Sequence, residues 1–269
     1  MTPSAEPHPP QDHRCLFLSD LHLGALGCRA DLLLAFLRRH QARTYYLVGD
    51  VLDLWSPLLP FWSEGHQAVL DHLRARADAG AELVYLPGNH DPDPAAAPSG
   101  KALPGLAAGA LVHQAADGRR YLVTHGDIID SRLIRSHVMT RLGSRLDHGL
   151  RLADRRLRRI GRGMRPDRRS LIEAAIAGLN ALFYLGRGHE RRLVALARAQ
   201  GLDGVICGHF HLARLHDDHG ATYANCGDWV DSFTALAEDF DGRLRLIGGR
   251  QAVPAAQAPA GALAGAVGT

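Results

Sequence analysis

The chain has 269 residues, of which 46% are hydrophobic and 22% charged, and its formal net charge is +3. This composition is that of a globular protein with a sizeable core. No stretch of about 18 uninterrupted apolar residues is present, and the N-terminus lacks a basic start followed by an apolar run. We therefore expect neither a membrane span nor a signal peptide, and a cytoplasmic location.

The expected elements fall into five stretches. Residues 1–13 read as a flexible arm, and residues 14–130 alternate apolar runs with helical patterns at 29–41 and 66–80. Long helical periodicity over 131–200 predicts an inserted helical cap, and short β runs return over 201–250, with hairpin signals at 217–220 and 239–242. The Ala-, Pro- and Gly-rich residues 251–269 are expected to form a disordered tail.

The net charge hides a strong asymmetry along the chain. Residues 131–200 contain 17 Arg and five acidic residues, while the rest of the chain holds 14 basic and 23 acidic residues. The expected cap is therefore a basic module with a net charge of +12.

The four cysteines form no Cys-x-x-Cys pair. We interpret them as thiols of a reducing compartment, two of them in or beside buried strands, rather than as disulfides or a zinc site. They are Cys15, Cys28, Cys207 and Cys226.

Polar side chains follow five of the expected strands where each apolar run ends. The runs are "CLFLSDLH" at 15–22, "YYLVGD" at 45–50, "LVYLPGNHD" at 83–91, "RRYLVTHGD" at 119–127 and "DGVICGHFH" at 203–211. One such run is ordinary turn chemistry, but five are not. Because strand ends in open α/β sheets converge on one crevice, we expect seven side chains to meet there: Asp20, His22, Asp50, Asn89, His125, His209 and His211.

This set of ligands combines carboxylate, amide and imidazole groups without a thiolate, which argues against a structural zinc site. It suits two divalent ions, with Mn²⁺ as the first choice and Mg²⁺ or Fe/Zn as alternatives. Two such ions can hold a hydroxide and neutralise charge during in-line attack on phosphorus. The pattern is therefore suited to in-line phosphoryl transfer.

The blocks "SDLHLG", "VGDVLDLW", "PGNHD", "THGD" and "CGHFH" occur in this order between residues 19 and 211. Together they resemble the five signature blocks of the calcineurin-like metallophosphoesterases. The resemblance implies an α/β fold, a four-layer α-β-β-α sandwich with an inserted helical cap, in which 14–130 and 201–250 form the core.

The resemblance also implies individual roles. Asp20, His22 and His211 would bind one ion, Asn89, His125 and His209 the other, and Asp50 would bridge them. His90 would contact the reacting phosphate, with Asp91 orienting its imidazole. On its own, His90 would be interpreted as a loop histidine, but its place between Asn89 and Asp91 favours a role in the site. Asp53 could either support the site or cap the next helix.

The closer resemblance is to the bacterial UDP-2,3-diacylglucosamine pyrophosphatase group, whose members release UMP and a lipid phosphate in lipid A synthesis. The blocks "GDVLDLW", "HGDIID" (125–130) and "NCGDWVDSFTAL" (225–236) carry it, together with the helical insert. At His90 the best-known branch of that group has Arg instead. We expect five substrate contacts: Asp130, Arg132, Arg135, Asn225 and Asp228.

The cap offers two interpretations. Its Arg clusters, above all at 155–169, could clamp phosphates, and Leu179, Leu182, Phe183 and Leu185 could line an acyl groove or lie on an anionic bilayer. That would bring the protein to the inner membrane as a peripheral protein with a lipid-linked phosphorylated substrate. Alternatively, the cap is an amphipathic helix pair packed on the core with a solvated basic side.

Other functions stay open at this point. The substrate could be another phospholipid or sugar nucleotide. A nuclease would also need a basic groove, but the sequence has no aromatic run for stacking bases, so nucleic acid is not the expected partner. A non-catalytic scaffold of the same fold would have lost ligands, and all seven are present.

Overall fold

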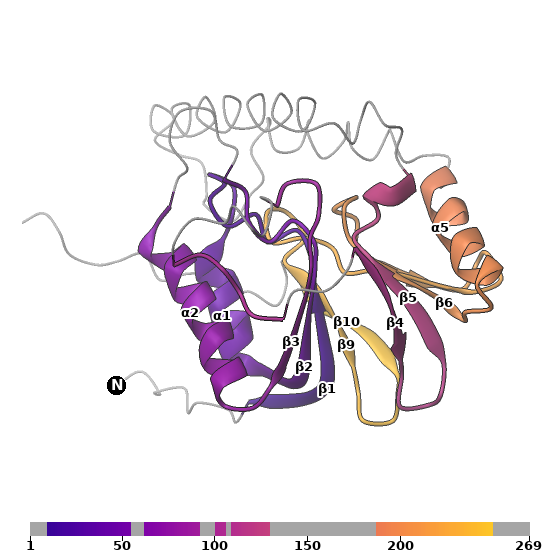
Figure 1. Ribbon diagram of the computed structural model, residues 1–269, viewed down its shortest axis with the longest axis horizontal. Helices are drawn as coiled ribbons and strands as arrows, with labels where there is room; N and C mark the ends of the chain where they lie inside the picture. The colour runs from indigo at the N-terminus through magenta and orange to yellow at the C-terminus, as the bar shows by residue number, and fades with distance from the viewer. Residues whose placement is uncertain (1–9, 55–61, 92–99, 106–108, 130–186, 250–269) are drawn as a thin grey trace, which may run out of the picture.

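The computed structural model describes residues 10–54, 62–91, 100–105, 109–129 and 187–249. These residues form a mixed α/β fold in which two five-stranded sheets lie between helices, with α1 and α2 outside the first sheet and α5 outside the second (Figure 1). The expected four-layer α-β-β-α sandwich is thus confirmed. No helix among the described residues is both long enough and apolar enough to cross a membrane.

The first sheet has the strand order β10-β9-β1-β2-β3. Strands β1, β2 and β3 are parallel to one another. Strand β9 is antiparallel to its neighbour β1, and β10 forms an antiparallel hairpin with β9. The bounds are β1 Gln11–Leu18, β2 His40–Val48, β3 Glu82–Leu86, β9 Thr234–Glu238 and β10 Leu244–Gly248.

The second sheet has the strand order β4-β5-β6-β8-β7, with β5, β6 and β8 parallel and the two edge strands antiparallel. Its bounds are β4 Ala110–Gln114, β5 Arg120–Thr124, β6 Gly204–Cys207, β7 Arg214–His216 and β8 Thr222–Asn225. A short 3₁₀ helix, η2 (Asp127–Ile129), follows β5. The mixed character expected for the second half of the chain is confirmed.

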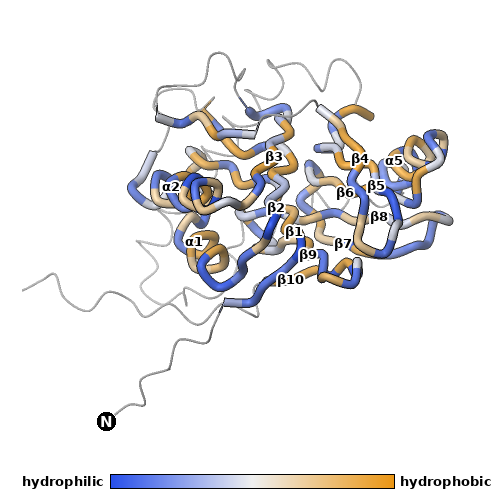
Figure 2. The backbone as a smooth tube through the Cα atoms, turned by 60° about the horizontal axis from the view of Figure 1, so that its bottom comes forward, coloured by the Kyte–Doolittle hydropathy of each residue, from blue (hydrophilic) through white to orange (hydrophobic). Residues whose placement is uncertain are grey.

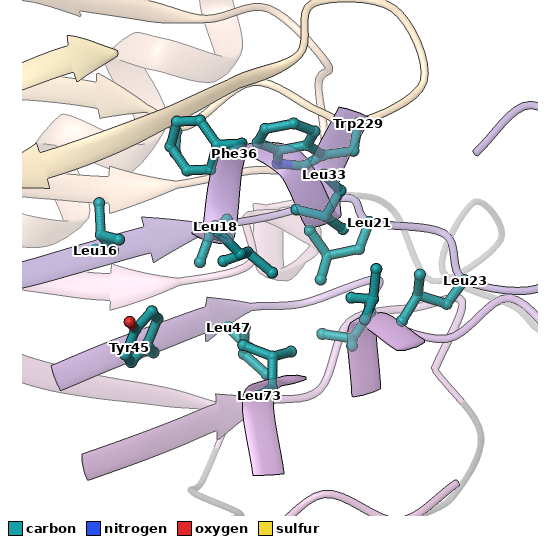
Figure 3. Close-up of a cluster of buried hydrophobic side chains, with 14 of the residues drawn as sticks. Leu16, Leu18, Leu21, Leu23, Leu33, Phe36, Tyr45, Leu47, Leu73 and Trp229 are labelled. Atoms are coloured by element: carbon teal, nitrogen blue, oxygen red, sulfur yellow. The ribbon is translucent and has the colours of Figure 1, made fainter. Parts of the chain in front are cut away.

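Two helices cover the outer face of the first sheet. Helix α1 (Ala30–Arg39) buries Leu33, Phe36 and Leu37 against the sheet and ends on basic residues, which suit a helix C-terminus. Helix α2 (Glu64–Asp78) begins with a capping box in which Ser63 Oγ accepts a hydrogen bond from the His66 amide. In Figure 3 the side chains of Leu33, Phe36 and Trp229 lie close together above the strands.

A second apolar layer lies between the two sheets, where Phe17 and Val48 of the first sheet pack with Val123 and Ile206 of the second. The third layer joins the second sheet to helix α5 (Gly188–Ala199) through Leu193, Val194 and Val205. Figure 2 shows the same distribution, with hydrophobic backbone stretches gathered in the strands. These layers fix the two sheets so that their strand ends face a common edge (Figure 1).

Several boundaries differ from the sequence-based ones. Strand β1 begins at Gln11, inside the expected arm, because residues 11–13 pair with 40–42 of β2. Helix α5 falls within the range expected for the cap, yet it packs on β6 and β8. Strand β4 was not expected, since it is a short edge strand with Val112 half exposed. The residues of the cap before 187, the start of the arm and the tail lie outside the described residues.

The two hairpins signalled by "DDHG" and "DFDG" are present. The amide of Gly220 donates to the Asp217 carbonyl, and that of Gly242 to the Asp239 carbonyl, which closes the β7–β8 and β9–β10 turns. All four cysteines are free thiols. Cys15 and Cys207 are buried, as expected, and so is Cys226.

Candidate metal centre

All seven side chains expected at the strand ends come together in the structure. The first sheet supplies four of them, because Asp20 and His22 follow β1, Asp50 follows β2 and Asn89 follows β3. The second sheet supplies the other three, His125 after β5 and His209 and His211 after β6. The cluster therefore spans both sheets rather than one sheet edge.

The first group consists of Asp20, His22 and His211, whose ligand atoms lie within 4.8 Å of one another. His211 Nε2 lies 3.3 Å from Asp20 Oδ1 and 3.3 Å from His22 Nε2. Asp20 Oδ2 accepts a hydrogen bond from the His209 amide, which leaves Oδ1 facing the two imidazoles. This arrangement offers one carboxylate oxygen and two ring nitrogens to a single ion.

The second group consists of Asp50, His125 and His209, with Asn89 beside them. His125 Nε2 lies 3.3 Å from Asp50 Oδ2 and 3.2 Å from Asn89 Oδ1. Its other nitrogen, Nδ1, lies 3.0 Å from the Val48 carbonyl, a contact that fixes the ring and directs Nε2 into the site.

Asp50 lies between the two groups. Its Oδ1 accepts a hydrogen bond of 2.7 Å from the His90 amide, while Oδ2 is 3.3 Å from His125 Nε2 and 4.0 Å from His22 Nε2. One oxygen is thus held by the backbone and the other faces imidazoles from both groups, which is the placement that a bridging ligand needs.

The backbone around the cluster is held in an unusual conformation. Five of the seven residues have a left-handed backbone with φ between 47° and 68°: Asp20, His22, Asp50, His209 and His211. For residues with a Cβ atom, this conformation costs about 1–2 kcal/mol each. Such strain is concentrated at functional sites, where the surrounding fold imposes it.

Glycines in the same loops let the chain segments approach one another. A Cβ atom on Gly88 would lie 2.3 Å from Asp50 Oδ1, and one on Gly208 would lie 2.4 Å from Ser19 Cβ. The glycines of "PGNH" and "CGH" are therefore required by close packing around the ligand atoms.

The electrostatics of the cluster fit cations. Asp20 and Asp50 are buried, and within the described part of the chain no Lys or Arg side chain pairs with either of them. Asp20 Oδ1 is also buried without a hydrogen-bond partner in suitable geometry. Buried carboxylates need compensating positive charge, so divalent ions match this donor set.

In the structure the imidazoles provide that charge. Burial alone would raise the pKa of Asp50, but His125 and the other neighbouring imidazoles outweigh it and hold the pKa well below its usual range. Conversely, burial would lower the pKa of His211, but Asp20 outweighs it and raises the pKa to about 10. A divalent ion would take over this role and leave the imidazoles neutral, as metal ligands require.

His90 lies at the same edge, where its side chain is 19% exposed. Its Nε2 is 4.0 Å from Asp50 Oδ2, and its Nδ1 is 3.2 Å from Asp53 Oδ2. Asp53 Oδ2 also lies 3.3 Å from His22 Nδ1. Asp53 therefore supports the site, while the cap of α2 is Ser63, which decides between the two roles open for Asp53.

The expected role of Asp91 requires a correction. Its carboxylate accepts hydrogen bonds of 2.7 Å from the amides of Leu52 and Gly88, so it ties the loop after β3 to the loop after β2. The carboxylate that holds the imidazole of His90 is that of Asp53. Burial, together with the charge of Asp50, raises the pKa of Asp91 to about 6.

Two of the expected substrate contacts, Asn225 and Asp228, are fully buried. Asn225 donates to the Gly208 carbonyl and accepts from the Gly227 amide, so it holds the loop that carries His209. Asp228 accepts from the Val230 amide, and its Oδ1 lies 3.8 Å from His211 Nδ1. The remaining contacts, Asp130, Arg132 and Arg135, lie outside the described residues.

Comparison with known proteins agrees with this geometry. A family model described as calcineurin-like phosphoesterase matches residues 13–213, which include every residue of the cluster. The chain belongs to the calcineurin-like phosphoesterase family. It is therefore a metal-dependent hydrolase, and its family implies the divalent ions that the donor set fits.

Two related proteins align with this chain over most of their own length. A UDP-2,3-diacylglucosamine hydrolase of Ralstonia nicotianae is 29% identical over 79% of this chain and 82% of its own. One of Neisseria meningitidis is 27% identical over 84% of this chain and 94% of its own. Among solved structures, a single mutant of Vps29 from Entamoeba histolytica matches 87% of this chain and 96% of its own, with 14% identity and a TM-score of 0.41.

Proposed function

We propose that this hydrolase cleaves the pyrophosphate bond of UDP-2,3-diacylglucosamine to give UMP and 2,3-diacylglucosamine 1-phosphate. The observation that carries the proposal is the similarity to proteins named UDP-2,3-diacylglucosamine hydrolase, which extends over 82% and 94% of their chains. The family match over residues 13–213 includes every strand end that supplies the metal cluster.

We further propose that two divalent ions, Mn²⁺ in the first place, bind at the cluster. Asp20, His22 and His211 would hold one ion and Asn89, His125 and His209 the other, with Asp50 shared. When bound, such ions polarise a phosphoryl group and activate water for in-line displacement. The mixed oxygen and nitrogen donor set supports this proposal.

The chain's own residues would position the proton transfer. The Asp53 carboxylate beside His90 Nδ1 favours a proton on that nitrogen and leaves Nε2 toward the site edge. His90 is more exposed than Asp50 beside it, and its backbone amide fixes Asp50. We assign to His90 the contact with the reacting phosphate and the supply of a proton to the leaving oxygen.

The basic segment 131–200 would contact the lipid-linked substrate and the membrane that holds it. Its excess of Arg suits a diphosphate and an anionic membrane surface. We propose that the protein works at the cytoplasmic face of the inner membrane through this segment, in contact with the substrate rather than with nucleic acid.

The test is release of UMP from UDP-2,3-diacylglucosamine by purified protein with Mn²⁺, run beside a chelated control. We expect UMP release that disappears with chelator. Bis-p-nitrophenyl phosphate serves as the second substrate. Chelator-sensitive turnover of this ester without any UMP release would contradict the substrate but keep the hydrolase, and would direct the search to other sugar nucleotides or phospholipids.

A further inference from the structure

A second candidate site lies on the outer face of the first sheet. A cavity of about 560 Å³ opens between helix α1, the edge strand β10 and the loop that follows β8. None of the seven residues of the metal cluster lines it. Its apolar wall consists of Leu32, Phe36, Trp229, Phe233, Leu246 and Ile247. This volume lies within the roughly 300–1,000 Å³ typical of small-molecule sites, which are also mainly apolar and aromatic.

The fold keeps this cavity open. Helices α1 and α2 lie over the parallel strands, while β9 and β10 continue the sheet beyond them (Figure 1). Gly248, at the end of β10, lines the cavity. Its φ is +87°, and a Cβ atom there would lie 2.6 Å from the Phe233 carbonyl oxygen. Trp229 packs on Phe36 with ring centroids 4.9 Å apart, so two aromatic rings form the inner wall.

The polar groups of the cavity lie at one end. Gln11, Arg39 and His40 line it there, from the start of β1 and the junction of α1 with β2. Of the described lining residues, Arg39 carries the one formal charge, and it makes no ion pair with the described part of the chain. Burial lowers the pKa of His40 to about 4, so this imidazole is neutral near pH 7.

An apolar chamber that ends at a guanidinium without an ion pair among the described residues is complementary to a molecule with the same two parts. The chamber excludes water from a hydrocarbon chain, and the guanidinium pairs with a carboxylate or phosphate. A purely apolar ligand would leave Arg39 unused, and a small inorganic anion would leave the aromatic wall unused.

We propose that this cavity binds a single-chain amphiphile with an anionic head group, its chain against Phe36, Trp229 and Ile247 and its head at Arg39. The site is separate from the metal centre, and the proposal does not depend on the substrate assigned to that centre.

Because Trp229 forms part of the wall, binding has a direct optical signal. Of the two Trp residues that the structure describes, Trp62 and Trp229, Trp229 lines the cavity. The probe is a dibrominated stearate, which quenches nearby indole fluorescence, titrated below its micelle concentration into the full-length, metal-loaded protein. We expect saturable quenching that is lost in Trp229→Phe.

Variants separate the two parts of the site. Arg39→Glu should raise the Kd for the probe about tenfold or more, as expected for loss of a charge-assisted contact. Arg38→Glu makes the same charge change on the neighbouring exposed residue, which does not line the cavity, and should leave the Kd unchanged. Ala35→Phe, which fills the cavity from the exposed side of α1, should abolish saturable quenching.

Three results would overturn the proposal. The first is absence of saturable quenching in the full-length protein, as expected if residues 250–269 or a second copy of the chain close the cavity. The second is an equal loss of affinity in Arg38→Glu and Arg39→Glu. The third is equal affinity for the corresponding dibrominated alcohol, which has no anionic head.

Discussion

Two regions of the molecule gather imidazoles around buried carboxylates, but they differ in the fixed positive charge beside those carboxylates. At the metal cluster, Asp20 and Asp50 face imidazoles alone within the described residues. At the outer edge of the second sheet, the buried Glu190 meets His216 and His219, but also two guanidiniums. Arg187 Nε lies 2.6 Å and Arg214 Nη1 3.0 Å from its carboxylate.

Both groups have the spacing of a metal site. The Glu190 group, however, is already neutralised by Arg187 and Arg214, so a divalent ion there would have to displace two cations. The difference teaches that proximity of His and carboxylate groups does not define a metal site by itself. The balance of fixed charge decides whether such a group takes up a cation or forms an ion-pair network.

The strongest way to test this comparison is to neutralise Asp50, the proposed shared ligand, with Asp50→Asn. We expect kcat/KM to fall by more than the roughly 10–100-fold typical of changes to outer-sphere partners. Bound Mn²⁺, measured by elemental analysis after gel filtration, should fall with it, because Asp50 faces both groups of ligands. Retention of the full metal content would contradict the bridging position.

The next effect concerns the residue that holds His90. Asp53→Asn should lower kcat roughly 10–100-fold and shift the pH profile of kcat, because the carboxylate beside His90 Nδ1 is lost. Asp91→Asn is the matched control at the neighbouring acid, and should act mainly on the melting temperature, since Asp91 ties two loops together. Equal pH profiles for Asp53→Asn and the wild type would refute the positioning role.

A smaller effect is expected in the second cluster. Glu190→Gln leaves Arg187 and Arg214 without their shared charge partner and should lower the free energy of unfolding by about 1–3 kcal/mol. Metal content and kcat should equal those of the wild type. Urea unfolding and elemental analysis of the same preparation measure both, and a parallel loss of Mn²⁺ would show that the two clusters are not independent.

The smallest effect is a pH dependence at a third group of histidines, His13 and His40, whose rings lie 5.4 Å apart. Burial lowers the pKa of His40 from 6.5 to about 4. Between these values the unfolded chain binds a proton that the folded chain excludes, so stability falls as the pH falls. Between pH 7 and pH 5 the titration of His40 should lower the free energy of unfolding by roughly 1–2 kcal/mol.

The variant His40→Gln tests that contribution, because it removes the imidazole whose pKa burial lowers. Its free energy of unfolding, measured in urea at both pH values, should fall less than that of the wild type. The opposite ranking would mean that His40 is charged in the folded protein.

The parts that the sequence predicted well are those in which ligand chemistry coincides with the end of an apolar run. Asp20, Asp50 and His125 follow buried strands directly, and strand ends meet at one edge whatever the details of the loops. The layered fold was predicted from the resemblance of the five blocks to the calcineurin-like signature blocks.

The parts that it did not predict depend on contacts between distant loops. Asp91 is next to His90 in sequence, but Asp53, from another strand end, is the carboxylate beside its imidazole. Asn225 and Asp228 are polar residues in a motif-like block, and only the fold shows that they are buried. The left-handed backbone of His22 and His209 has no signature in residue type.

The division of the metal ligands between the two sheets has a consequence for biosynthesis. Asp20 and His22 precede His209 and His211 by almost 190 residues, with the whole basic segment between them. A nascent chain that has just completed the basic segment therefore carries five of the seven expected ligands and still lacks His209 and His211. Metal uptake has to be a late event, so a chain that stops before residue 211 is left without a complete ion site, whatever the supply of metal in the cell.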